Sequence, residues 1–177
     1  RQTMLHNKKW KIQSSDAIGL TIDLHPLVKQ ILVNRGYKDD ESANRFLNPK
    51  LSDLHDPMLM KDMEKAVSRI EEAVENQENI LVYGDYDVDG TTAVSLLASY
   101  LKTVHKAVAT YIPDRYEEGY GISFQGIDFA ADNEMGLIIA LDCGIKAIDK
   151  VAYASEKGID FIICDHHRPG EFLPEAV

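Results

Sequence analysis

The chain has 177 residues, of which 45% are hydrophobic and 27% charged, so it is long enough to bury a sizeable core. With 29 acidic and 19 basic residues its formal net charge is −10, and residues 114–177 alone hold 13 acids against 5 bases. This balance argues against a simple electrostatic DNA-binding module, which should be basic. No apolar run approaches the roughly 18–20 residues of a membrane span and no signal peptide opens the chain, so we expect a cytoplasmic protein without a membrane partner.

The first 77 residues are expected to form an arm followed by a small helical segment. Residues 1–20 show no hydrophobic period, and we expect Trp10 to dock this arm on the body of the protein. Apolar residues then recur at helical spacing in three stretches, at 25–35, 40–47 and 63–78.

From residue 78 onward, short apolar runs alternate with helical patterns. The runs at 80–83, 107–112, 137–141 and 159–164 are typical of buried parallel strands. Helical patterns follow Gly90 and recur at 124–131 and 145–157. This alternation predicts an α/β fold in which a doubly wound parallel sheet, flanked by helices, occupies residues 78–177.

Acidic residues directly follow three of these strands. Because the carboxyl ends of parallel strands meet at one edge of a sheet, the acids are expected to gather there with two histidines. The residues concerned are Asp85, Asp87 and Asp89 after the first strand, Asp142 after the third, and Asp165, His166 and His167 after the fourth. If residues 85–89 are extended, their three carboxylates point the same way. Divalent cations would relieve the repulsion, and this set of carboxylates and imidazoles suits Mn²⁺ or Mg²⁺.

The segment after the first strand also has features of a phosphate site. Gly84 and Gly90 let the backbone approach a ligand closely, and the next helix, with Thr91 near its start, offers its N-terminus to a phosphate. Two-metal centres activate water for displacement at phosphorus. The lack of a GK[ST] sequence excludes a P-loop, and Gly119-Tyr120-Gly121 matches a dinucleotide fingerprint only in part, because the third glycine is missing.

Each of these features also has a simpler interpretation. DxD tripeptides are common in turns, a strand-terminal Asp often caps the next helix, and paired histidines are often structural or solvated. Their joint occurrence at the ends of adjacent strands favours a metal site. His6, His25, His55 and His105 have no such acidic company and are expected on the surface.

Three segments resemble the first three motifs of the DHH phosphoesterase superfamily: GDYDVDGTTA (84–93), LDCGI (141–145) and DHH (165–167). The segments IPDRYEEGYGIS (112–123) and RGYKDDESANRFLNPKLSDLHDP (35–57) are similar to the RecJ family within it. The resemblance runs from about residue 33 to residue 169. It implies a DHH-type fold and a two-metal phosphodiester hydrolase, namely a 5′→3′ exonuclease that acts on single-stranded DNA and releases 5′-mononucleotides.

The resemblance also implies roles for individual residues. Metal ligands would be Asp87, Asp89, Asp142 and His166, with Asp142 bridging two ions and Asp85 either a ligand or a close neighbour of the ligands. Asp165 would orient a histidine, and His167 would contact the scissile phosphate or act as an acid. Arg115 and the loop at 117–120 would meet the nucleotide, while Gly90 and Thr91 would serve phosphate binding. One departure is Tyr83, which stands where many superfamily members have a histidine ligand.

The family pattern continues beyond the last residue of this chain. A fourth motif with another metal-binding Asp and a second, substrate-holding domain are absent, so we expect an N-terminal part of a longer enzyme that need not be active alone. The expected partners are single-stranded DNA and other DNA repair or replication proteins.

Three alternatives stay open. Another DHH phosphoesterase would hydrolyse short oligonucleotides, cyclic dinucleotides or pyrophosphate, whereas the helical N-terminal segment and DRYEEGYGIS favour the RecJ family. A non-catalytic DHH scaffold in replication machinery should have lost some of the acidic and histidine positions, which are intact here. A phospho-acceptor receiver-type domain would leave the DHH sequence unexplained.

Overall fold

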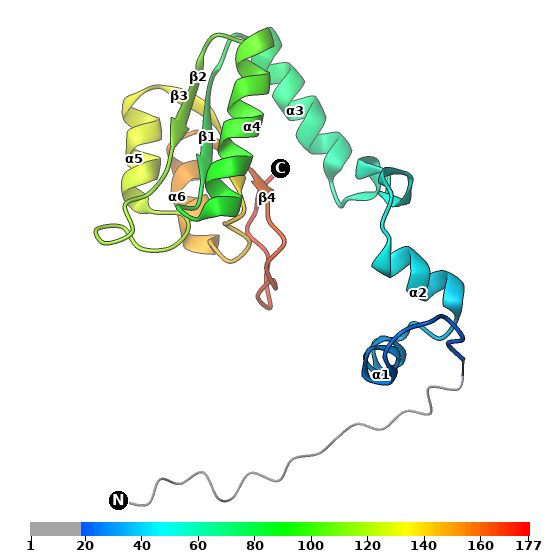
Figure 1. The fold of residues 1–177 in the computed structure, drawn as a ribbon. Helices are drawn as coiled ribbons and strands as arrows, with labels where there is room; N and C mark the ends of the chain where they lie inside the picture. Colours follow the sequence, from blue (N-terminus) through cyan, green and yellow to red (C-terminus); the bar gives the residue numbers. More distant parts are fainter. Residues whose placement is uncertain (1–18) are drawn as a thin grey trace, which may run out of the picture. The chain divides into compact units, whose positions relative to one another are not determined.

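The computed structural model describes residues 19–177, which fall into two compact units that divide between Asp56 and Pro57 (Figure 1). The expected arm, with Trp10 and His6, lies outside the described residues. Each unit has its own apolar core.

The described part of the first unit, residues 19–56, contains two short helices and a 3-10 turn. These are α1 (Pro26–Asn34), α2 (Asp40–Leu47) and η1 (Leu51–Asp53). Leu20, Leu32 and Ala43 form a small buried core between them. The side chain of Asp39 caps α2 by accepting a hydrogen bond from the Ser42 amide at 2.8 Å. Both helices expected in this region are therefore confirmed.

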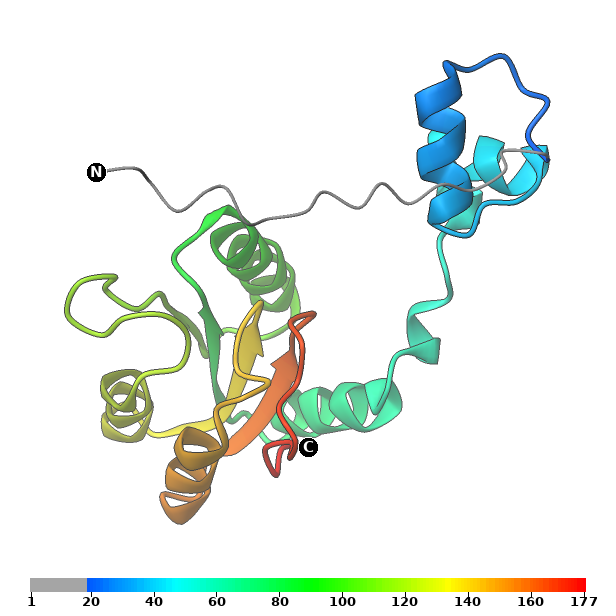
Figure 2. The same ribbon diagram turned by 90° about the horizontal axis from the view of Figure 1, so that it is seen from below.

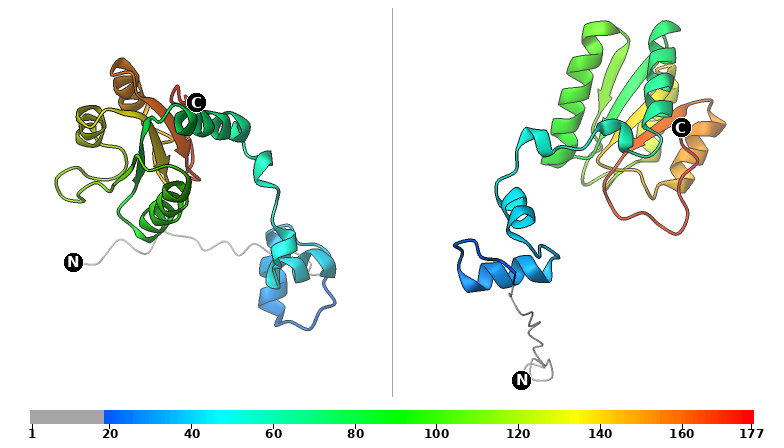
Figure 3. Two further views of the ribbon diagram at one scale, coloured as in Figure 1. Left: turned by 90° about the horizontal axis from the view of Figure 1, so that it is seen from above. Right: turned by 90° about the vertical axis from the view of Figure 1, so that its right-hand side faces the viewer.

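The second unit is built on four parallel strands. They are β1 (Asn79–Gly84), β2 (Val108–Tyr111), β3 (Met135–Leu141) and β4 (Asp160–Cys164). The strand order is β2-β1-β3-β4, and every neighbouring pair runs parallel. The C-terminal segment leaves β4, loops outward and returns, where the Val177 amide donates to the carbonyl of Phe161 at 2.9 Å (Figure 3).

Helices cover both faces of this sheet (Figure 2). Helices α3 (Met63–Glu75) and α4 (Val88–Val104) cover one face, and α5 (Phe124–Asp132) and α6 (Ile148–Glu156) cover the other. A 3-10 turn, η2 (Pro57–Leu59), precedes α3 in the chain. Strand β1 shows why two layers form, since Ile80 and Val82 pack toward α3 and α4 while Leu81 and Tyr83 pack toward α5 and α6. The predicted α/β fold with a helix-flanked parallel sheet is confirmed.

Two local features differ from the sequence-based expectations. Helix α3 buries Ala73 against the sheet and packs Ala66 and Ile70 on the same core, so the second unit begins at Pro57 rather than at residue 78. His105 was expected on the surface but is buried, with Nε2 2.7 Å from the carbonyl oxygen of Glu78. Its position at the end of α4, beside the start of β1, turns the ring inward. Among residues 19–177, no helix has both the length and the apolar character needed to cross a membrane.

The strand order places a topological switch point between β1 and β3. The chain leaves β1 for β2 on one side, and then crosses back to β3 on the other side. In open α/β sheets, ligands bind outside the carboxyl ends of the strands at such a point. Asp85 and Asp142 follow the two strands that flank the switch point, so the fold indicates a ligand site at the carboxyl edge of the sheet.

Candidate metal centre

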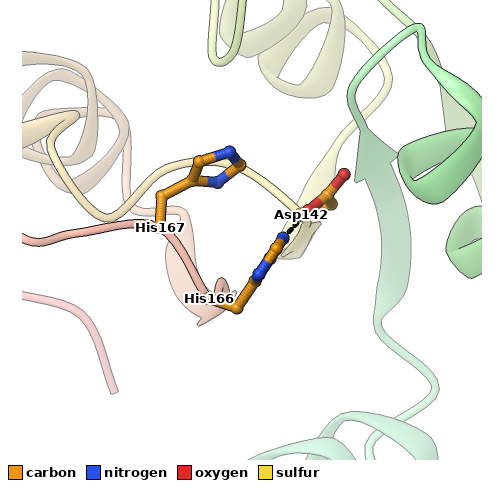
Figure 4. Close-up of side chains that lie close together, drawn as sticks. All are labelled: Asp142, His166 and His167. Carbon is orange, nitrogen blue, oxygen red and sulfur yellow. Dashed lines mark ion pairs between the residues drawn. The ribbon is translucent and has the colours of Figure 1, made fainter. Parts of the chain in front are cut away.

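Asp142, His166 and His167 form a group that could hold a metal ion. One ligand atom from each residue lies within 4.8 Å of the others. Figure 4 shows the ring of His166 pointing at Asp142, where Nε2 is 2.9 Å from Oδ1. The side chain of Asp142 is only 9% exposed, whereas that of His166 is 75% exposed. A nearly buried carboxylate is thus paired with an imidazole that reaches solvent.

The backbone explains why Asp142 is held so firmly. Its φ of 59° lies in the left-handed region, which residues other than Gly rarely adopt. Its amide donates to the carbonyl oxygen of Cys164 at 2.8 Å, which ties the end of β3 to the end of β4. The turn after β3 therefore presents this carboxylate beside the residues that follow β4.

Asp165 forms two hydrogen bonds with His167, two residues further along the chain. Oδ1 of Asp165 accepts from Nδ1 of the ring at 2.7 Å and from the His167 amide at 2.9 Å. Oδ2 accepts from the Ile145 amide at 3.0 Å. Burial alone would raise the pKa of Asp165, but these hydrogen bonds outweigh it and the pKa lies below its ordinary value. The hydrogen bond with Asp165 in turn raises the pKa of His167.

The charges of four carboxylates act on the buried thiol of Cys143. Burial raises the pKa of this thiol, and the negative charges of Asp85, Asp165, Asp142 and Asp87 raise it further. The pKa of Tyr120 rises to about 12 because its ring is partly buried and the charges of Asp85, Asp165 and Asp142 act on it. Acidic side chains from the ends of β1, β3 and β4 therefore share one strongly negative neighbourhood, as expected from the strand-end pattern.

The acids of the first motif do not lie on one extended segment. Asp85 directly follows β1 and is 1% exposed, but helix α4 already begins at Val88. Asp87 is the helix cap, since its Oδ1 accepts from the Gly90 amide at 3.0 Å. Asp89 lies in the first helical turn and is exposed. The expected parallel alignment of three carboxylates is thus replaced by a strand end, a cap and a helical turn, and none of them belongs to the group around Asp142.

Gly90 and Thr91 are engaged within the protein. A Cβ at Gly90 would lie 2.4 Å from the carbonyl oxygen of Asp85 and 2.6 Å from its nitrogen. The close backbone approach that Gly90 permits is therefore between α4 and the end of β1. The hydroxyl of Thr91 donates to the carbonyl oxygen of Asp87 at 2.7 Å, within the first turn of the helix.

An aromatic and cationic patch borders the acidic cluster. The guanidinium carbon of Arg115 lies 5.3 Å from the ring centre of Tyr86, within cation–π range. The ring of Tyr86 meets the ring of Tyr120 edge-on at 6.4 Å between centres. The hydroxyl of Tyr120 is 3.3 Å from Nε2 of His167. The family resemblance implies a substrate contact for Arg115, but Tyr86 and Cys143 were not predicted as site residues from the sequence. Their positions next to Asp85 and Asp142 in the sequence could have indicated them.

This donor set fits divalent cations. Carboxylate oxygens together with imidazole nitrogens are ligands that Mn²⁺ and Mg²⁺ accept, and a positive charge would relieve the repulsion among the acids. Fold and site together define an α/β domain with a candidate carboxylate–imidazole metal site at the carboxyl edge of its sheet.

Comparison with known proteins specifies the family. Residues 79–177 match the DHH family, N-terminal domain, and the chain belongs to this family. It is 44% identical, over 98% of its length, to the single-stranded-DNA-specific exonuclease RecJ of Bacillus subtilis, of which it covers 23%. It is 32% identical over 90% of its length to the Haemophilus influenzae protein of the same name, of which it covers 27%. The chain thus spans about a quarter of these relatives.

Solved structures give the same picture. A crystal structure of exonuclease RecJ bound to manganese aligns with a TM-score of 0.62 and 33% identity, covering 66% of this chain and 30% of the other. RecJ of Thermus thermophilus in complex with Mn²⁺ aligns with a TM-score of 0.61 and 27% identity, covering 82% of this chain and 19% of that one. The resemblance seen in the motifs therefore extends to the three-dimensional fold.

Proposed function

We propose that this chain supplies most of the metal centre of a 5′→3′ exonuclease that acts on single-stranded DNA and releases 5′-mononucleotides. The observation that carries the proposal is the group of Asp142, His166 and His167, which could hold a metal ion at the carboxyl edge of the sheet, where Asp85 also follows β1. The names of the relatives support the choice of substrate. Such an enzyme would work in the cytoplasm and meet other DNA repair or replication proteins.

The proposed ligands are Asp87, Asp89, Asp142 and His166, with Asp85 close by. Asp142 suits a bridging role because its nearly buried carboxylate is fixed between the ends of β3 and β4. Bound there, Mn²⁺ or Mg²⁺ would offset the acidic charge and stabilise the negative charge that develops on a phosphate under attack.

His167 is the proposed group that contacts the scissile phosphate. Asp165 holds its Nδ1 and raises its pKa, so the ring keeps a second proton at Nε2 over a wider pH range. That nitrogen lies beside the hydroxyl of Tyr120, at the rim of the acidic cluster. A cationic ring in this position can bind a phosphate oxygen or give its proton to the leaving oxygen.

Arg115 and the neighbouring tyrosine rings form the proposed nucleotide contact. A guanidinium binds phosphate oxygens, and exposed aromatic rings stack on bases without regard to sequence. Tyr116 is 93% exposed and Tyr120 is 58% exposed, so both rings have free surface next to Arg115. Because the chain has a net charge of −10, its overall electrostatic attraction for DNA is weak. Binding of the nucleotide would therefore depend on local contacts with Arg115 and the tyrosine rings.

The test is digestion of labelled DNA by the full-length protein that carries this chain, with Mn²⁺ present. With 5′-labelled single strands we expect labelled mononucleotide from the first turnover, while 3′-labelled strands shorten before releasing label. Duplex DNA should resist. Asp89→Ala, Asp142→Asn and His167→Ala should abolish release.

Two exposed residues that are not part of the candidate site provide matched controls. Asp132→Asn makes the same change as Asp142→Asn at the end of α5, and His55→Ala repeats the loss of an imidazole. Both should digest like the parent. Equal digestion by Asp142→Asn and Asp132→Asn would contradict the proposed centre, and release of label first from the 3′ end would contradict the polarity.

A further inference from the structure

The carboxylate of Glu118 joins three parts of the loop between β2 and α5. Oε1 accepts from the Asp114 amide at 2.7 Å, which closes the start of the loop. Oε2 accepts from the hydroxyl of Tyr111 at 2.8 Å, at the end of β2, and from the hydroxyl of Ser123 at 2.5 Å, the cap of α5. One acidic side chain therefore binds both ends of the loop to its middle.

Tyr83 fixes the second half of the same loop. Its ring is fully buried in β1, and its hydroxyl donates to the carbonyl oxygen of Gly121 at 2.9 Å. The Ser123 amide donates back to that hydroxyl at 3.1 Å. The side chain thus points toward the loop, and its hydroxyl is occupied there rather than at the metal centre.

The loop carries a tyrosine between two glycines in the left-handed region. Gly119 has φ of 83° and Gly121 has φ of 81°, values that residues with a Cβ rarely adopt. This backbone turns Tyr120 toward the site, where its hydroxyl meets Nε2 of His167 and its ring meets Tyr86. The EGYG sequence, which a dinucleotide fingerprint does not explain, therefore has a structural purpose.

We propose that Glu118 and Tyr83 are positioning residues, which together form a latch that holds the 112–123 loop so that Arg115 and Tyr120 face the metal centre. The part of this proposal that concerns substrate rests on the proposed nuclease function. The latch itself does not, because its hydrogen bonds are internal to the domain. Loss of the latch should free the loop and weaken the hold on the nucleotide while leaving the metal ligands in place.

Limited trypsin digestion tests the latch without relying on activity. Arg115 is an exposed cleavage site within the loop, and Lys102 in α4 serves as an internal reference. In Glu118→Gln, an amide cannot accept all three hydrogen bonds, so we expect cleavage after Arg115 to speed up several-fold relative to cleavage after Lys102. Glu156→Gln removes the same charge from an exposed residue at the end of α6, outside the loop, and should behave like the parent.

Steady-state digestion of single-stranded DNA by the full-length protein tests the positioning role. Because misplaced binding groups weaken substrate contacts, Glu118→Gln should raise KM about ten-fold and change kcat far less. Tyr83→Phe, which keeps the buried ring and loses only the hydroxyl, should change both assays in the same direction. Tyr83→Phe also keeps the proposal testable if Glu118→Gln fails to fold.

The outcomes separate the two proposals. An active parent whose KM is unchanged in the folded latch variants overturns the positioning role, as does an equal rise of KM in Glu156→Gln. Unchanged cleavage after Arg115 overturns the latch whatever the activity. A parent that digests no DNA contradicts the proposed nuclease function, and the protease assay then decides on the latch alone.

Discussion

Nδ1 of His167 lies 2.7 Å from Oδ1 of Asp165, and the His167 amide donates to the same oxygen. The carboxylate is 2% exposed and the imidazole 46%, so a buried anion holds a ring that still reaches solvent. The relationship fixes the orientation of the ring and favours its charged form. It makes the first and third residues of the DHH sequence a preorganised pair, which can be tested before any substrate is added.

The pKa of His167 should fall when Asp165 is replaced. The hydrogen bond and charge of Asp165 raise this pKa, and Asp165→Asn removes the charge while keeping the shape. We expect the ring protons of His167 to titrate at lower pH in the metal-free variant, measured by NMR. Asp132→Asn is the control and should leave the titration in place. An unchanged His167 titration in Asp165→Asn would show that the contact does not govern the charge.

Gly90→Ala should destabilise the second unit. The new Cβ would meet backbone atoms of Asp85 at 2.4–2.6 Å, and backbone at a strand end cannot move aside as a flexible side chain can. Overpacking of this kind costs about 2–3 kcal/mol, which exceeds the gain of about 1 kcal/mol from the better helix propensity of Ala. Urea unfolding followed by circular dichroism measures the difference.

Gly170→Ala is the matched control for that measurement. The nearest atom to a Cβ at this position is the carbonyl oxygen of Phe172 at 3.5 Å, an ordinary contact. Its unfolding should coincide with that of the parent. If Gly90→Ala also unfolds with the parent, the tight approach between α4 and β1 is not a constraint on the sequence.

Glu118 should make the free energy of unfolding of the second unit depend on pH. Burial opposes its charge, but hydrogen bonds from Ser123, the Asp114 amide and Tyr111 outweigh it and hold its pKa below the ordinary value. A depressed pKa contributes stability that is present above the unfolded value and is lost as the pH falls through the folded value. Glu118→Gln should therefore cost about 1–2 kcal/mol at neutral pH and progressively less in acid. A deficit that stays constant with pH would contradict this account.

Much of the fold could be predicted from the sequence, because buried parallel strands appear as short apolar runs. All four strands were expected within one or two residues of where they lie, and so was the edge where the acids gather. The strand order could not be derived, since each run is apolar on both faces and carries no sign of its neighbours. Helix α3 showed its apolar stripe but not the surface that would cover it.

The details of the site were less accessible than its location. An extended segment and a capped helix both fit the sequence from Asp85 to Asp89, and the cap by Asp87 decides between them. The place of Cys143 among the acids, and the inward turn of His105, depend on how the ends of elements pack. Such contacts join residues distant in sequence, which no local pattern encodes.

The central claim is that the carboxyl edge of the sheet binds divalent cations through Asp142. Its most direct test is a Mn²⁺ titration of the full-length protein that carries this chain, with free Mn²⁺ measured by its electron paramagnetic resonance signal. We predict saturable binding by the parent and by Asp132→Asn, and a clear loss of bound Mn²⁺ in Asp142→Asn, with all three proteins unfolding alike in urea. Equal binding by Asp142→Asn and Asp132→Asn would contradict the account.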